Sequence, residues 1–241
     1  MARLLAGILM LTPAASGFEL PRNCSQVVVG ITSTWQSSHI TVSVYEKGPR
    51  GTWRKAAGPW AGRCAKKGLA WGRGLHPLAP DSPRKTEGDW RSPAGVFRIG
   101  GAWGYHKAIS KHPELTYRRV TSRDLWVEDP SSSYYNRHLI LGHEPSKAWE
   151  KKAQMRQDDY PHSLKLYIAH NTYPKPLPGA GSAIFFHIWR DKGSRPTSGC
   201  TTMPEKHLRA LIALIDPGRN PLYVLLPREN YSALKNSWRL P

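Results

Sequence analysis

The chain is poor in cysteine and lacks short metal-binding motifs. Its 241 residues include three cysteines and contain neither a CxxC pair nor an HExxH run. Structural and catalytic zinc sites usually place their ligands at such spacings. An alternative zinc site would combine His143, His170 and His187, but no spacing supports it. We therefore predict no metal site and no cofactor.

Acidic residues are also scarce. The 17 Asp and Glu residues oppose 35 Lys and Arg residues, which gives a formal net charge of +18 at pH 7. Such an excess predicts that the protein works near anionic material, unless the charge serves only solubility. The basic residues are scattered and form no helix-turn-helix, zinc-finger or RRM pattern, so we expect no nucleic-acid partner.

Long apolar runs are absent after the N-terminus, so nothing there predicts a membrane span. Residues 1–11 contain one basic residue and a short apolar core, and small residues follow at 14–17. This pattern is typical of a signal peptide, which we predict to cover residues 1–17; an uncleaved anchor is the alternative. Residues 18–241 would then act in the periplasm or as a secreted, cell-envelope protein, where anionic envelope polymers are further partners.

Helical signals are few, and most of the chain is typical of β structure. No repeat or long linker divides residues 18–241, so we predict one domain. We also expect a monomer, although no sequence pattern indicates the oligomeric state. Two segments predict helices, 145–157 and 204–215. The expected strands are rich in β-branched and aromatic residues and cover 27–32, 39–45, 95–99, 163–169, 183–189 and 221–226. A mainly β sandwich or open barrel follows.

One histidine and one cysteine come close together late in the chain. His187 lies in the apolar strand 185–189, and Cys200 follows after a polar loop, just before the amphipathic helix predicted at 204–215. A nearby imidazole and the N-terminal end of a helix both favour a reactive thiolate. Gly199 leaves room beside the sulfur for backbone N–H groups to face an oxyanion. The pattern predicts a cysteine nucleophile on a loop at one edge of the sheet.

These residues resemble the signature of the L,D-transpeptidase (YkuD-like) catalytic domain, in which a histidine precedes a Ser/Thr-x-Gly-Cys element. Residues 88–99 are similar to the family's Ser/Thr-Pro-x-Gly-x-Phe hairpin, and 179–184 lead into the histidine strand as in one secreted branch. The resemblance covers residues 25–227. Two positions depart from the common pattern: His187 is followed by isoleucine rather than glycine, and Thr202 stands where many members have Arg or Asn. The chain thus resembles a divergent branch.

The resemblance implies acyl transfer on peptidoglycan stem peptides. Cys200 would attack the carbonyl before a terminal D-Ala, and His187 would serve as general base, oriented in this family often by a backbone carbonyl. Ser198 and Gly199, with the backbone N–H of Cys200, would hold the oxyanion. An amine acceptor gives a crosslink, whereas water makes the protein an L,D-carboxypeptidase or endopeptidase. A catalytically silent wall-binding module is the third alternative.

Two further expectations concern other residues. His170 and Asn171 follow an apolar run and are candidates for a second substrate contact in the cleft, with an ordinary strand-end pair as the alternative. In an exported protein an odd cysteine is a candidate reactive thiol, so Cys200 would stay free and Cys24 would form a disulfide with Cys64. Three reduced thiols in a cytosolic protein are the alternative.

Overall fold

A computed structural model describes residues 17–77, 82–172 and 174–241. The predicted signal peptide at 1–17 therefore lies outside the described residues except for Gly17. Within the described ranges, no helix is both long and apolar enough to cross a bilayer.

The protein is mainly β, as predicted, and its long sheet closes on itself. Strands follow one another in the order β12-β1-β2-β3-β11-β10-β9-β5, and β12 also pairs with β5, so the path returns to its start. The strands of this barrel are β1 (Gln26–Thr32), β2 (His39–Lys47), β3 (Trp53–Arg63), β5 (Ser92–Gly104), β9 (Leu164–Ile168), β10 (Phe185–Ile188), β11 (Thr201–Met203) and β12 (Leu222–Pro227). Two short strands, β4 (Leu69–Trp71) and β6 (Tyr117–Arg119), pair with β5.

Alternation along the strands divides the apolar side chains between two clusters. In β1, Val28 belongs to the larger cluster, while its neighbours Val27 and Val29 belong to a second cluster with Trp238. Successive strand residues face opposite sides of a sheet, so both faces of β1 are buried. Each face of the sheet therefore needs other elements packed against it, and helices near the C-terminal end of the chain supply them.

Two helices provide this cover. Helix α2 (Glu205–Leu214) buries Leu208, Leu211 and Ile212 in the larger cluster. Helix α3 (Arg228–Leu234) and the residues after it bring Trp238 onto the second cluster, where it contacts Phe18. Among the described residues, short 3₁₀ turns also occur at η1 (Pro161–Ser163), η2 (Asp191–Gly193) and η3 (Pro217–Arg219).

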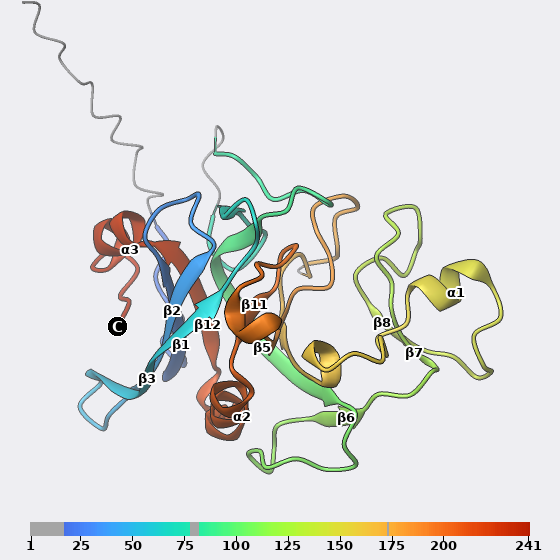
Figure 1. Ribbon diagram of the computed structural model, residues 1–241. Helices are drawn as coiled ribbons and strands as arrows, with labels where there is room; N and C mark the ends of the chain where they lie inside the picture. The colour runs from blue at the N-terminus through green and yellow to red at the C-terminus, as the bar shows by residue number, and fades with distance from the viewer. Residues whose placement is uncertain (1–16, 78–81, 173) are drawn as a thin grey trace, which may run out of the picture.

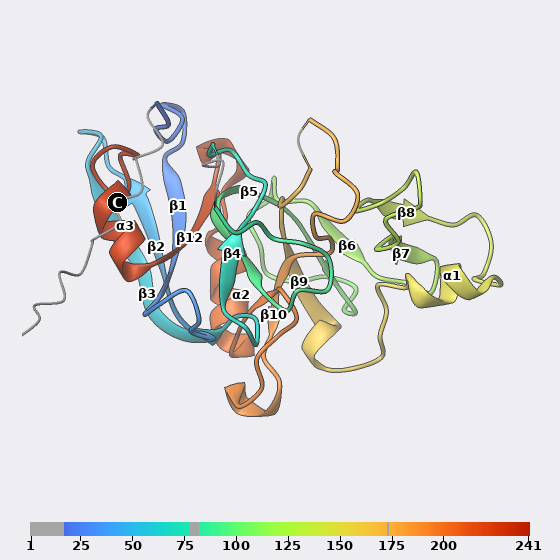
Figure 2. The same cartoon turned by 90° about the horizontal axis from the view of Figure 1, so that it is seen from above.

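A lobe formed by residues 120–160 stands beside the barrel, on the side opposite α3 (Figures 1 and 2). It contains β7 (Asp124–Trp126), β8 (His138–Ile140) and α1 (Ala148–Lys152). Asp124, fully buried, accepts hydrogen bonds from the backbone N–H of Thr121 at 2.9 Å and the Thr121 hydroxyl at 2.7 Å, and it pairs with Arg118 and His138. This carboxylate therefore links β6, the turn before β7, and β8.

The helix predicted at 145–157 is much shorter than expected. Only Ala148–Lys152 is helical, because the following residues pair with β7 instead. The backbone N–H of Trp126 donates to the carbonyl of Ala153, and the N–H of Met155 donates to the carbonyl of Asp124. These sheet-like hydrogen bonds to a distant segment override the local helical preference.

The predicted disulfide between Cys24 and Cys64 is wrong: both are buried free thiols, in different hydrophobic clusters. Cys24 lies beside the end of β2 near Glu46, whereas Cys64 lies beside its start at His39. At about 3.3 Å per residue, the length of β2 separates them by on the order of 25 Å. A disulfide requires Cα atoms within about 7 Å of each other.

Candidate active site

The register of three neighbouring strands places His187 and Cys200 on the same face of the barrel wall. His187 of β10 pairs with Lys165 of β9 on one side and with Thr202 of β11 on the other. Cys200 precedes β11 directly, and its Sγ accepts a hydrogen bond from the backbone N–H of Phe185 at 3.4 Å. Because residues two apart on a strand face the same side, the imidazole and the thiol line one surface.

This surface is the floor of a cavity of about 520 Å³ between the barrel and the lobe. Its walls come from segments far apart in the sequence, and they carry charged side chains of both signs. The charged and titratable lining residues are Lys85, Glu87, Glu128, His162, Lys165, His187, Arg190, Arg195 and Cys200. The cavity is therefore polar.

The thiol of Cys200 is held by the residues before β10. Its Sγ lies 3.5 Å from the carbonyl oxygen of Ala183, to which it donates. Burial raises the pKa of Cys200 to about 11; the carboxylate of Glu128 also raises it, whereas Lys165 and Lys85 act in the opposite direction. The thiol is thus protonated at neutral pH.

The thiol does not lie at the N-terminal end of a helix, contrary to the sequence-based expectation. Strand β11 intervenes, and α2 begins only at Glu205, after Pro204. Three strand residues extend about 10 Å, beyond the first helical turn over which the dipole acts. Nor is Cys200 at a sheet edge, because β11 lies between β3 and β10. The predicted lowering of the thiol pKa by the helix is therefore wrong.

His187 is oriented by a backbone carbonyl. Its Nδ1 lies 2.8 Å from the carbonyl oxygen of Ile188, and because a carbonyl only accepts, Nδ1 must carry the proton. Nε2 is then the free acceptor nitrogen of a neutral ring. Burial, with the nearby His162, lowers the pKa of His187 to about 3, so the imidazole stays neutral at pH 7. Its side chain has the protonation state that a general base needs.

The loop before the cysteine is fixed by a residue that the sequence analysis missed. The hydroxyl of Thr197 donates to the carbonyl of Cys200 at 2.6 Å and accepts the backbone N–H of Gly199 at 3.2 Å. The Gly199 N–H therefore has a partner within the loop, while Ser198 is exposed at the cavity wall. A threonine followed two residues later by a glycine can accept that residue's backbone N–H, so the sequence carried a local signal for this turn.

The Ser-Pro-x-Gly segment at the start of β5 contacts the cysteine loop directly. The buried hydroxyl of Ser92 accepts the backbone N–H of Ala65 at 2.9 Å and lies 3.5 Å from the carbonyl of Cys200. Gly95, with φ of +130°, leaves no space for a side chain, since an added Cβ would lie 1.8 Å from the ring of His76. The hairpin motif thus supports the site through packing and hydrogen bonds.

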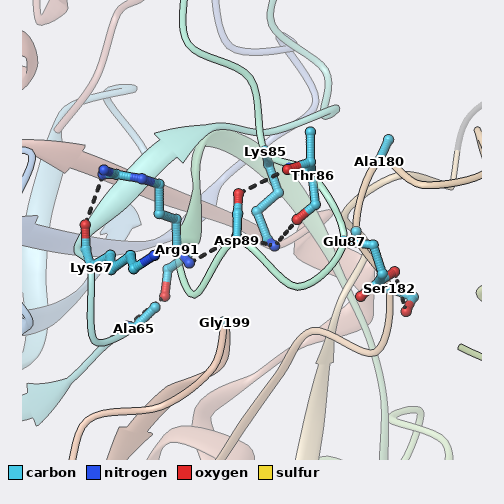
Figure 3. Close-up of polar contacts among 12 residues, drawn as sticks. Ala65, Lys67, Lys85, Thr86, Glu87, Asp89, Arg91, Ala180, Ser182 and Gly199 are labelled. Atoms are coloured by element: carbon cyan, nitrogen blue, oxygen red, sulfur yellow. Dashed lines mark hydrogen bonds and ion pairs between the residues drawn. The ribbon is translucent and has the colours of Figure 1, made fainter.

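The turn formed by residues 85–89 borders the cavity close to Gly199 (Figure 3). Lys85, buried, forms an ion pair with Asp89 at 2.6 Å. Glu87 accepts hydrogen bonds from the hydroxyls of Ser182 at 2.8 Å and Tyr135 at 2.5 Å. The turn thereby connects the barrel wall to the lobe, and the charge of Lys85 is neutralised locally.

His170 and Asn171 lie behind the cavity wall and are not among its lining residues. His170 Nδ1 accepts the backbone N–H of Arg73 at 3.2 Å, and Nε2 donates to the carbonyl of Ala180 at 2.9 Å. The Asn171 amide donates to the carbonyls of Leu177 and Gly181. The structure therefore places this pair as buried supports of the 177–181 loop, not in the cleft as expected.

A second imidazole lies over His187. The rings of His162 and His187 stack with centroids 4.7 Å apart, and His162 Nδ1 lies 2.7 Å from the carboxylate of Asp159. Arg190 pairs with the other oxygen of Asp159 at 2.5 Å. Sequence analysis missed this cluster because its members come from two separate segments, 159–162 and 187–190.

A possible metal-binding group lies elsewhere. Among the described residues, His112, Glu114 and Asp216 have ligand atoms within 4.8 Å of one another. None of the three lines the cavity. Asp216 already accepts the backbone N–H of Gly218 and pairs with Arg219.

Fold and site together define a β-barrel domain with a cysteine and a neutral histidine facing one polar cavity. Residues 34–224 match the family model YkuD, the L,D-transpeptidase catalytic domain, and the chain belongs to this family. The resemblance inferred from the Ser-Gly-Cys motif is thereby confirmed. Members of the family are typically peptidoglycan L,D-transpeptidases. A search of curated proteins found no matching relative.

Proposed function

We propose that this protein is a peptidoglycan L,D-transpeptidase-like enzyme in which Cys200 is the nucleophile and His187 the general base. The observation that carries the proposal is the placement of both side chains on one face of β10 and β11, on the floor of the cavity. The carbonyl of Ile188 leaves Nε2 of His187 free to accept a proton. Membership of the family supports a stem peptide as the substrate.

The first half-reaction forms an acyl-enzyme. Cys200 Sγ attacks the carbonyl that precedes the terminal D-Ala of a tetrapeptide stem, while His187 Nε2 accepts the thiol proton. The carbonyl electrons move to oxygen and give a tetrahedral oxyanion. When this intermediate collapses, the bond to D-Ala breaks and His187 returns its proton to the leaving amine. A thiol with a raised pKa needs such a base at the moment of attack.

The oxyanion would be held by donors around the cysteine loop. The exposed hydroxyl of Ser198 and the backbone N–H of Cys200 are our candidates, since the Gly199 N–H bonds Thr197. One such donor typically lowers the activation barrier by about 3 kcal/mol.

The second half-reaction decides the product. An amine of a second stem attacks the thioester and gives a crosslink, whereas water releases a tripeptide and makes the enzyme an L,D-carboxypeptidase or endopeptidase. We favour transfer, because the cavity carries carboxylates as well as cations. The carboxylates of Glu87 and Glu128 suit the approach of an acceptor stem peptide, whose amine arrives as an ammonium group. A silent wall-binding module is the remaining alternative. The proposed setting is the periplasm or cell envelope, where the charge of +18 favours anionic polymers.

The test is mass spectrometry of the purified protein incubated with tetrapeptide muropeptides and a D-amino acid. Loss of D-Ala with exchange or a dimeric product, absent in Cys200→Ala, would support transfer. The matched control is Cys24→Ser, which alters a buried thiol outside the cavity and should retain turnover. Tripeptide alone would favour the hydrolase, and no reaction in the unmodified protein would contradict the proposal.

A further inference from the structure

Lys165 is a buried cation whose ammonium group bonds a backbone carbonyl. Only 4% of the residue is exposed, and its Nζ donates to the carbonyl of Met155 at 2.6 Å. Among the described residues, no carboxylate lies within ion-pair distance of this ammonium group, whereas Lys85 in the same cavity is paired with Asp89. An ammonium group removed from water is costly unless an anion compensates it.

The strand register directs this side chain toward the candidate catalytic pair. Lys165 is the residue of β9 that pairs with His187, so both side chains leave the sheet on the cavity side. Its Nζ lies 5.9 Å from the centre of the Phe185 ring, and the backbone N–H of Phe185 donates to Cys200 Sγ. The ammonium group therefore lies next to the strand residue that contacts the sulfur.

We propose that the ammonium group of Lys165 stabilises the Cys200 thiolate that forms during attack, in place of the helix terminus that β11 holds away. The inference rests on the proposed function, because it assumes that Cys200 reacts as a thiolate. The proton of the thiol goes to His187 Nε2, and Lys165 keeps its own proton throughout. It contributes charge and takes no part in proton transfer.

The other charges around the sulfur supply less of this field. Glu128 opposes thiolate formation, and the His187 ring is neutral before attack. Lys85 also lowers the pKa of Cys200, but less than Lys165 does, and its charge is paired with Asp89. Of the anionic groups that act on Lys165, Cys200 has the strongest effect, followed by Asp159 and Glu128. The nearby His162 ring is itself paired with Asp159.

The titration of Lys165 provides a distinctive signature. Burial lowers the pKa of Lys165 to about 8, while the anionic groups oppose this shift. The side chain is therefore charged at pH 7 and largely neutral above pH 9. An arginine at the same position stays charged throughout this range.

The experiment measures the rate of Cys200 alkylation by iodoacetamide in the full-length protein, followed by peptide mass spectrometry from pH 7 to pH 10. An opposite charge a few ångströms away shifts a pKa by about one unit or more, so Lys165→Met should react about tenfold more slowly than the unmodified protein at pH 7. This difference should disappear above pH 9. Lys165→Arg should react within about threefold of the unmodified protein at pH 7 and faster than it at pH 10. Lys152→Met removes an exposed charge from the end of α1 and should react normally.

Equal rates for Lys165→Met and the unmodified protein at pH 7 would overturn the inference. The inference would also be overturned if Lys165→Met slowed alkylation equally at pH 7 and pH 10. That result would indicate a structural role for the hydrogen bond from Lys165 to the carbonyl of Met155. Circular dichroism shows whether Lys165→Met folds. If it does not, the alkylation rates of Lys165→Arg and the unmodified protein at pH 7 and pH 10 test the inference. Alkylation measures the reactivity of the thiol and requires no turnover. Its outcomes are therefore separate from those of the turnover assay, in which acyl transfer by Cys200→Ala would contradict the proposed function.

Discussion

Asn136 Oδ1 accepts the backbone N–H of Ala183 at 3.1 Å, and the carbonyl of that same Ala183 accepts the thiol of Cys200. The amide of Asn136 also accepts the Trp126 indole N–H at 3.0 Å and donates to the carbonyls of His170 and Asn171. Ala183 has φ of +53°, a left-handed conformation that is costly for alanine. One buried amide in the lobe thus holds the strained residue that contacts the Cys200 thiol.

Replacement of Asn136 by alanine should therefore affect both stability and activity. Four hydrogen bonds are lost and their buried partners are left unpaired, which we expect to lower the free energy of unfolding by about 2–4 kcal/mol. Denaturant unfolding measures this change, and acyl transfer should fall because Ala183 is released. Asn236→Ala, at an exposed position, is the matched control. Full turnover in a folded Asn136→Ala protein would contradict the role given to this contact.

Thr197 should matter through its hydroxyl. Thr197→Val keeps the shape of the side chain but removes both hydrogen bonds to the cysteine loop, so we expect about tenfold slower acyl transfer and a stability loss of about 1 kcal/mol. Thr197→Ser retains the hydroxyl and should restore most of the rate. Comparison of initial rates by mass spectrometry tests this, and equally impaired valine and serine variants would indicate that the methyl group matters instead.

Acid should destabilise the fold through three buried histidines. Burial lowers the pKa of His76 to about 4 and those of His170 and His187 to about 3, against 6.5 for an exposed ring. The unfolded chain therefore binds more protons below pH 6.5, and stability falls as pH decreases from 6.5 toward 4. Each ring contributes up to about 1.4 kcal/mol per pH unit.

Urea unfolding at pH 7, 6 and 5 measures this dependence. His187→Asn removes one of the three titrating rings, and we expect the slope to decrease by about one third. Constant stability from pH 7 to pH 5 in the unmodified protein would contradict the assignment of neutral buried rings.

The cysteines should remain unlinked. Thiol quantification of the denatured, unreduced protein is expected to give three free thiols, because β2 separates Cys24 from Cys64 and Cys200 lies in the cavity. Pretreatment with a reductant should leave the number unchanged. Detection of a linked Cys24–Cys64 peptide would require a strand register different from the one described here.

Several features of the site were predictable because they depend on local sequence. Alternation and β-branched residues predicted most barrel strands, and the Ser-Gly-Cys element after the His187 strand pointed to the family, which residues 34–224 confirm. The closure of the sheet was not predictable, because β12 joins β1 and β5 across long sequence separations. The short strand β11 was also missed, since three residues before a helix carry no periodicity.

The sequence by itself determined the chemical groups of this protein: one cysteine beside a glycine, a histidine in an apolar strand, and an excess of basic side chains. Only the tertiary structure decided which of these groups act on one another. Pairing of β9, β10 and β11 aligned Lys165 with His187, and burial set the protonation state of the imidazole and the thiol. Both effects arise from contacts between segments distant in sequence and from the exclusion of water, neither of which a linear pattern contains.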